Sequence, residues 1–213
     1  MGAPWISNTG NRFMKNDMAL HYDRLIDENN DPVNDPPPLK EYMDKWDGQA
    51  FLEKLEVNAD KTVLEIGVGT GRLAVRVAPF CRAFTGIDLS PKTIIRAKEH
   101  LGTIDRVTLI CGDFNTYDFS ENFDVIYSSL TFMHIEDKQS AVNKVYRLLN
   151  PSGRFILSID KNQEPFIDLG SRRIEIYPDN PEDTESFLKA AGFVITETVE
   201  TEFACVFVAE KGE

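Results

Sequence analysis

The sequence predicts an α/β fold in which a mostly parallel sheet carries helices on both faces, and three observations lead to this prediction. From residue 61 onward, short apolar runs alternate with amphipathic segments, which is typical of strands connected by helices. A glycine-rich turn follows the first of these runs. Two apolar runs near the end of the chain are joined by a very short connection, which can link two neighbouring strands only if they are antiparallel.

The first sixty residues are predicted to form a helical cover over this core. Residues 19–28 have helical spacing, whereas residues 29–38 contain four prolines and are expected to form a loop. Helical spacing returns over residues 39–57 and is interrupted near Gly48. Asp47 is expected to cap the helix that begins there.

The core elements follow in chain order. Strands are expected at residues 62–66, 82–87, 106–110, 123–128, 154–159, 193–201 and 203–210, with helices at 71–79, 91–101, 137–149 and 180–191. The turns after the parallel strands lie at one edge of the sheet, where ligands bind in open α/β folds. Four phenylalanines at strand or helix spacing are expected in the core: Phe80, Phe84, Phe123 and Phe155.

Length and composition restrict the classes of function. The 213 residues fit one domain, with the cover at 1–60 and the core at 61–213. The 23 Lys and Arg residues against 35 Asp and Glu give a net charge of -12, which disfavours nucleic acid as a partner. No apolar run reaches the roughly 18 residues that span a bilayer, and the three cysteines lack metal-ligand or disulfide spacing. We therefore expect a cytoplasmic protein with no membrane partner and no metal.

The glycine turn is the most informative motif. In VLEIGVGTGRLA, residues 63–74, glycines at positions 67, 69 and 71 separate a strand from a helix. Such glycines let the backbone approach a ligand closely, while the free amides at the start of the helix face it. The fingerprint for dinucleotides places its third small residue one position later, where this chain has Arg72. A ligand other than NAD is therefore predicted.

Acidic residues near the turn indicate the charge of this ligand. Glu65 precedes the first glycine, Asp88 ends the second strand and Asp113 follows the third. Three carboxylates repel a pyrophosphate but suit a ligand with an ammonium, a sulfonium and ribose hydroxyls, and S-adenosylmethionine has these groups. Asp88 is expected to accept hydrogen bonds from the ribose. Asp113 and Phe114 are expected at the adenine, although Asp113 can instead cap its own turn, and Glu65 can be an ordinary strand-end carboxylate.

These motifs resemble the class I S-adenosylmethionine-dependent methyltransferases, particularly the small-molecule type with a ubiquinone-biosynthesis-like domain. The segments VLEIGVGTGRLA, GIDLS, GDF, FDVIYSSLTFMHI and LLNPSGRFILSID match motifs of that family in order, over about residues 61–160. The resemblance implies a Rossmann-like, seven-stranded sheet whose last strand is antiparallel. This agrees with the terminal strand pair predicted from the spacing alone.

The resemblance also implies roles for single residues. The match to Glu65 and the glycine turn faces the methionine part of the cofactor, and the match to Ser128 lines the cofactor at the fourth strand. Tyr22, in the segment HYDRLIDE, matches a tyrosine that folds over the bound cofactor. The predicted cofactor-binding residues are Tyr22, Glu65, Gly67, Gly69, Asp88, Leu89, Asp113, Phe114 and Ser128.

His134 is the predicted catalytic residue. It follows the fourth strand, and an imidazole there can accept a proton from the methyl acceptor. The alternative is that it only supports the turn, and Met133, where many relatives have a second histidine, argues against a catalytic histidine pair. Residues 161–180 are expected to form a substrate lid in which Arg172 and Arg173 can hold a substrate carboxylate, although paired arginines in so acidic a chain can instead be surface charge.

The predicted function is transfer of a methyl group from S-adenosylmethionine to an O, N or C atom of a small molecule, which leaves S-adenosylhomocysteine. Direct in-line displacement needs chiefly alignment of donor and acceptor. No Asn-Pro-Pro-aromatic signature of nucleic-acid methyltransferases occurs, because FDVIYSSLTFM occupies that position. A binding protein of the same fold that transfers nothing is the alternative. The chain is expected to be a monomer or a homodimer.

Overall fold

The structure, a computed structural model, describes residues 9–168, 170 and 172–212. A seven-stranded sheet has the order β3-β2-β1-β4-β5-β9-β8, and only β9 runs antiparallel to its neighbours. The predicted sheet is confirmed. Its strands are β1 (Thr62–Ile66), β2 (Ala83–Asp88), β3 (Val107–Cys111), β4 (Phe123–Ser129), β5 (Leu149–Asp160), β8 (Phe193–Glu200) and β9 (Ala204–Lys211).

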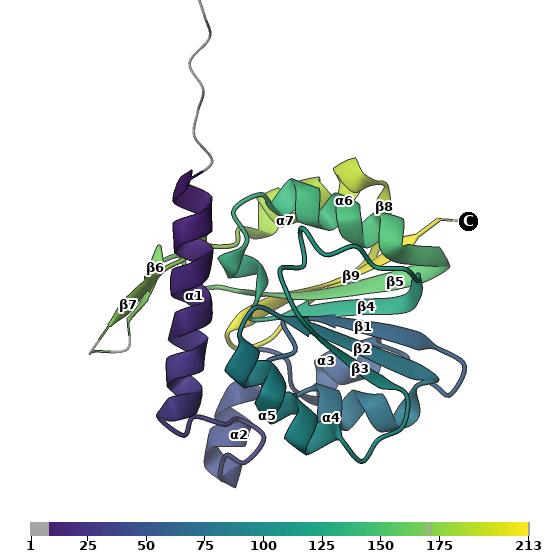
Figure 1. The fold of residues 1–213 in the computed structure, drawn as a ribbon. Helices are drawn as coiled ribbons and strands as arrows, with labels where there is room; N and C mark the ends of the chain where they lie inside the picture. Colours follow the sequence, from purple (N-terminus) through teal and green to yellow (C-terminus); the bar gives the residue numbers. More distant parts are fainter. Residues whose placement is uncertain (1–8, 169, 171, 213) are drawn as a thin grey trace, which may run out of the picture.

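Helices cover both faces of this sheet, as predicted (Figure 1). Below it in the view lie α3 (Gly48–Lys54), α4 (Ala74–Val77) and α5 (Pro91–Leu101), and above it lie α6 (Lys138–Leu148) and α7 (Pro181–Ala191). Each face has its own apolar core, in which Phe84 packs on the lower side and Phe123 and Phe155 on the upper side. These helices do not cover the carboxyl ends of the parallel strands (Figure 1).

Local signals set the ends of helices α5 and α7. Ser90 accepts a hydrogen bond from the Thr93 amide at 3.1 Å, and Pro91 opens α5. Asn180 accepts one from the Glu182 amide at 2.9 Å at the start of α7. Gly192 ends α7 with a φ of 101°, a left-handed conformation that favours glycine. Both helices therefore occupy the residues that the sequence predicts.

The N-terminal cover stands across the carboxyl edge of the sheet (Figure 1). Its first helix, α1 (Thr9–Asp27), begins earlier than the predicted residue 19, and α2 (Pro37–Met43) follows the proline-rich loop. Asp23 on α1 accepts hydrogen bonds from Ser90 Oγ at 2.6 Å and from the Lys92 amide at 3.0 Å. These contacts attach α1 to the start of α5.

The structure corrects three local predictions. Asp47 does not cap α3, because its carboxylate contacts side chains elsewhere in the fold. The predicted helix at 71–79 shortens to α4 and the 3₁₀ turn η1 (Ala78–Phe80), since Gly71 has a φ of 100°. Phe80 then faces outward and is 65% exposed, so its prediction as a core residue was wrong.

The predicted lid segment forms a small hairpin of its own. Strands β6 (Phe166–Asp168) and β7 (Arg173–Glu175) pair beside α1, on the far side of α1 from the sheet in Figure 1. The Tyr177 amide donates to the carbonyl of Met133 at 2.8 Å, which ties the end of the hairpin to the 3₁₀ turn η2 (Phe132–His134). The hairpin and α1 thus lie over the segment that carries His134.

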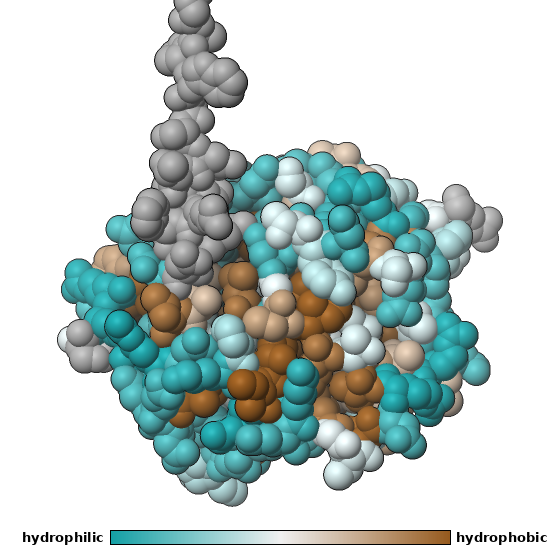
Figure 2. Space-filling view, in the orientation of Figure 1, coloured by the Kyte–Doolittle hydropathy of each residue, from teal (hydrophilic) through white to brown (hydrophobic). Residues whose placement is uncertain are grey.

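The surface in this orientation is not uniformly polar. Hydrophobic residues gather in the middle of the face, beside α1, and hydrophilic residues surround them (Figure 2). Ile95 on α5 and Tyr117 after β3 are among the exposed large hydrophobic residues. Within the described residues, no helix combines the length and the apolar character that crossing a membrane requires.

Candidate active site

The glycine turn begins directly after β1 and is held by main-chain hydrogen bonds. The Gly67 and Val68 amides both donate to the carbonyl of Ile87 on β2, at 2.8 and 3.1 Å. Gly67 and Gly69 have φ values of 78° and 56°, in the left-handed region that disfavours other residues. The turn therefore lies between the ends of β1 and β2.

The two glycines face different surroundings. A β-carbon on Gly67 would lie 1.9 Å from Thr131 Oγ1, so the space above Gly67 is filled by the segment after β4. A β-carbon on Gly69 would meet no atom within 4 Å. Gly67 therefore allows close packing of two segments, whereas Gly69 leaves the backbone open to a ligand.

Asp88 lies next to the open part of the turn. One of its carboxylate oxygens accepts from the Gly69 amide at 3.0 Å, and the other accepts from the Ser90 amide at 3.0 Å. Burial raises the pKa of Asp88 from its ordinary value. Leu89 is half-buried beside it. The structure thus brings together Gly69, Asp88 and Leu89 at the carboxyl edge.

Glu65 is buried beneath the turn and is 4% exposed. Tyr127 on β4 donates its hydroxyl to Glu65 Oε2 at 2.8 Å. Burial raises the pKa of Glu65 to about 8, so the carboxyl group is mostly protonated at pH 7. A cation bound nearby would favour its charged form.

Three further predicted residues make contacts within the fold. Asp113 Oδ1 accepts from the Asn115 amide at 2.9 Å, the local capping contact that the sequence left open. Phe114 is 6% exposed and belongs to the upper core. Ser128 donates to the carbonyl of Ile66 at 2.9 Å and so connects β4 to β1. Their predicted contacts with a cofactor remain predictions.

Tyr22 and His134 are brought together across the edge of the sheet. The Tyr22 hydroxyl lies 2.7 Å from His134 Nε2, while His134 Nδ1 is buried and has no hydrogen-bond partner among the described residues. Burial lowers the pKa of His134 to about 4, so the imidazole is neutral at pH 7. Burial and the charge of Asp88 raise the pKa of Tyr22. Tyr22 therefore lies close to both Asp88 and the predicted catalytic residue.

Sequence reasoning missed one cluster next to this pair. His21 is only 5% exposed, and its Nδ1 accepts from Arg172 Nε at 3.0 Å. Arg172 also donates to both carboxylate oxygens of Glu28, at 2.6 and 2.7 Å. Its guanidinium thus holds a carboxylate from the end of the N-terminal cover helix. No local pattern could have shown a contact between residues 151 positions apart.

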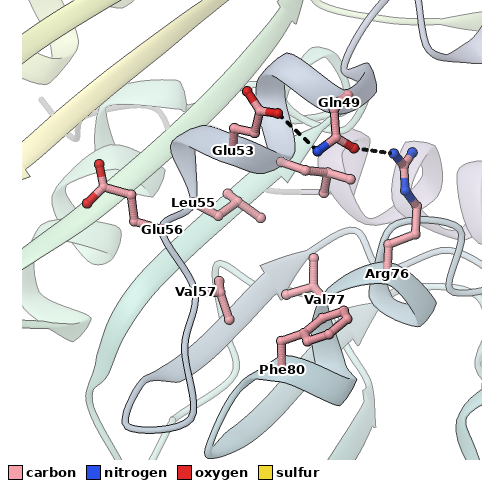
Figure 3. A pocket seen from close by; sticks show the side chains of 9 residues that line it. Gln49, Glu53, Leu55, Glu56, Val57, Arg76, Val77 and Phe80 are labelled. Atoms are coloured by element: carbon pink, nitrogen blue, oxygen red, sulfur yellow. Dashed lines mark hydrogen bonds between the residues drawn. The ribbon is translucent and has the colours of Figure 1, made fainter.

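A pocket of about 490 Å³ lies elsewhere, between α3 and the α4–η1 segment (Figure 3). Gln49 bridges Glu53 and Arg76 at its rim, with hydrogen bonds of 3.1 and 3.3 Å, and Val77 and Phe80 contribute apolar surface. None of the predicted site residues lines it. The described residues contain no group of three or more His, Cys, Asp or Glu side chains that could hold a metal ion.

Comparison with known proteins identifies the domain that carries this geometry. Residues 64–157, from β1 into β5, match the family described as a methyltransferase domain. These matched residues include the glycine turn and Asp88, so the part of the chain that forms the candidate site is similar to a methyltransferase domain. The match agrees with the family predicted from the sequence, and the sheet has the predicted fold.

Two relatives in sequence are also named as methyltransferases. A malonyl-(acyl-carrier protein) O-methyltransferase of Priestia megaterium is 36% identical over 106 residues, which cover 47% of this chain and 37% of that methyltransferase. The match therefore spans little more than a third of the length of that relative. An uncharacterized methyltransferase of Anoxybacillus flavithermus is 28% identical over 190 residues, covering 81% of this chain and 88% of that protein.

A solved structure shares the methyltransferase fold over most of the chain. The DhpI–SAH complex has a TM-score of 0.74 at 17% identity, covering 93% of this chain and 97% of DhpI.

Alanine substitutions at Gly67 and at Gly69 should lower the stability of the fold by different amounts. Gly67→Ala is expected to lower the free energy of unfolding by about 3 kcal/mol, because the new methyl group overlaps Thr131 and the left-handed backbone is strained. Gly69→Ala carries only the backbone strain, about 1–2 kcal/mol. Urea denaturation measures both values, and equal losses would contradict the packing role of Gly67.

Replacing Glu65 should change how stability depends on pH. Its pKa is about 8 in the folded state and near its ordinary 4.5 when unfolded, so folding takes up a proton. The stability from this group is lost as pH rises from 4.5 to 8, by up to about 1.4 kcal/mol per pH unit. The side chain introduced by Glu65→Gln cannot titrate. The free energy of unfolding of the variant, measured from pH 5 to 8, should therefore rise relative to that of the wild type as the pH increases. A difference that stays constant with pH would contradict this.

Proposed function

We propose that this chain methylates a small-molecule acceptor with S-adenosylmethionine bound at the glycine turn. The observation that carries the proposal is the Asp88 carboxylate beside Gly69, whose backbone faces open space at the carboxyl edge. Open sheets of this kind bind ligands at that edge. A carboxylate at this position attracts a nucleoside that carries a positive charge and repels a phosphate group.

The residues present fit the cofactor. Asp88 Oδ2 accepts from the Gly69 amide and retains a second lone pair, so it can also accept from a ribose hydroxyl. Gly69 permits close approach, and Glu65 beneath the turn gains charge when a cation is near. Tyr22 would cover the ligand from α1, and Asp113, Phe114 and Ser128 would border it.

The chemistry needs little from the protein beyond alignment. S-adenosylmethionine supplies a methyl group already activated by its sulfonium. Alignment of the acceptor with that methyl group can contribute on the order of 7 to 11 kcal/mol in ideal systems. α1 and the β6–β7 hairpin lie over the segment that carries His134 and would exclude water from the acceptor.

His134 is the proposed proton acceptor for a hydroxyl substrate. Its Nδ1 has no partner among the residues described, and its low pKa keeps the ring neutral and able to accept. Acceptance at Nδ1 requires the tautomer with the proton on Nε2, which then donates to the Tyr22 oxygen. Tyr22 would hold the ring in the orientation that presents Nδ1 to the acceptor.

The proposed acceptor is a small molecule, and the proposed location is the cytoplasm. A net charge of -12 opposes binding to a nucleic-acid backbone. Cys81, Cys111 and Cys205 are all free thiols, which is in keeping with a reducing compartment.

Calorimetric titration with S-adenosylhomocysteine tests the proposed cofactor site. Asp88→Ala is expected to weaken binding by about 1–3 kcal/mol, because it removes a charged acceptor of hydrogen bonds. Asp60→Ala is the matched control, since Asp60 is an exposed carboxylate before the opposite end of β1. Wild-type affinity in Asp88→Ala would remove the ribose role, and no binding by the wild type would overturn the site.

Conversion of S-adenosylmethionine to S-adenosylhomocysteine with a panel of hydroxyl, amine and carboxylate metabolites tests the catalytic step. With a hydroxyl acceptor, His134→Gln should reduce turnover about 100-fold or more. The wild-type acid limb should lie near pH 4, because burial lowers the pKa of His134 to about 4. Unchanged turnover in the variant would leave His134 a supporting residue. A bound cofactor that reacts with no acceptor would favour the non-catalytic alternative.

A further inference from the structure

Asp47 is a fully buried carboxylate in the short connection between α2 and α3, with an exposed fraction of 0%. Arg72 donates to it through both terminal nitrogens, the Nη1 bond being 2.8 Å. Ser129 Oγ donates to Asp47 Oδ2 at 2.6 Å. Asp47 thus joins three segments that are far apart in the sequence.

These partners lie at the two ends of the glycine turn. Arg72 directly follows Gly71, the last glycine of the turn. Ser129 ends β4 two residues before Thr131, whose side chain fills the space above Gly67, the first glycine. The contacts therefore form a closed ring. The chain runs through the turn from Gly67 to Arg72, Asp47 bonds to both Arg72 and Ser129, and Thr131 packs back against Gly67.

The β4 end of this ring is conformationally strained. Leu130, between Ser129 and Thr131, has a φ of 53°, which is uncommon for a residue other than glycine. Thr131 Oγ1 donates to the carbonyl of Ser129 at 3.0 Å. Such a conformation persists only where surrounding contacts hold it, and the bond from Ser129 to Asp47 is one of them.

We propose that Asp47 is a positioning residue that couples the N-terminal cover to the cofactor turn. Burying an ion pair contributes little net stability compared with apolar packing, so stability alone does not account for a charge at this place. The ring makes docking of the cover and ordering of the turn mutually dependent. A ligand that favours the ordered turn therefore favours the docked cover, and the reverse holds by linkage.

This inference rests on the proposed binding of S-adenosylmethionine at the turn. Its test is titration of the full chain with S-adenosylhomocysteine, combined with hydrogen exchange over residues 37–54. Asp47→Asn should weaken binding about 10-fold or more, within the usual range of coupling between sites. In the wild type the ligand should slow exchange over residues 37–54, and in the variant this protection should be lost at saturating ligand.

Asp44→Asn is the matched control. Asp44 lies one turn earlier and pairs with Arg76 on α4 at 3.2 Å, but this pair is partly exposed and outside the ring. We expect affinity within about twofold of the wild type and normal protection in this variant. A loss of affinity as large as that in Asp47→Asn would overturn the inference, because the loss of any contact between the cover and α4 would then be enough to weaken binding.

Ser129→Ala provides the test if Asp47→Asn does not fold, because it keeps the Asp47–Arg72 pair and removes only the link to β4. We expect affinity to fall about fivefold with reduced protection of residues 37–54. Wild-type affinity and protection in a folded Asp47→Asn or in Ser129→Ala would overturn the positioning role alone. A wild-type chain that does not bind S-adenosylhomocysteine would overturn the proposed cofactor site, and the coupling with it.

Discussion

The end of strand β4 lies directly against the turn that follows β1, and this contact is possible only because Gly67 has no side chain. A β-carbon there would lie 1.9 Å from Thr131 Oγ1. The contact holds the turn so that Gly69 faces open space while its amide donates to Asp88. The proposed cofactor site therefore owes its shape to packing between the segments that follow β1 and β4, and this packing requires a glycine at position 67.

Three carboxylates surround this turn, two of them buried and that of Asp88 half-buried, and each has a different kind of partner. Glu65 accepts from a tyrosine hydroxyl, Asp88 from two backbone amides, and Asp47 from an arginine and a serine. Burial raises the pKa values of Glu65 and Asp88, so a positive charge placed near them would stabilise their charged forms. This arrangement favours a cationic nucleoside over a pyrophosphate.

Sequence reasoning succeeded where local signals or strand order decide the outcome. The apolar spacing of residues 91–101 predicted α5, and the order of β1 and β2 brought Gly69 and Asp88 to the same edge. It failed where contacts with a distant segment of the chain determine the structure. The spacing of Phe80 indicated a core residue, yet the helix ends before it. The β6–β7 hairpin has strands of three residues, too short for a periodic pattern. The partners of Asp47 lie 25 and 82 positions away, and a helix cap was the only role that its neighbours indicated.

The central claim is that the nucleoside of the cofactor binds between the open backbone of Gly69 and the carboxylate of Asp88. A crystal structure of the full chain grown with S-adenosylhomocysteine tests this most directly. Ribose hydroxyls are expected within hydrogen-bonding distance of Asp88, with the thioether chain passing over Gly69. Ligand density at another place, with Asp88 bonded only to the backbone amides of Gly69 and Ser90, would contradict it.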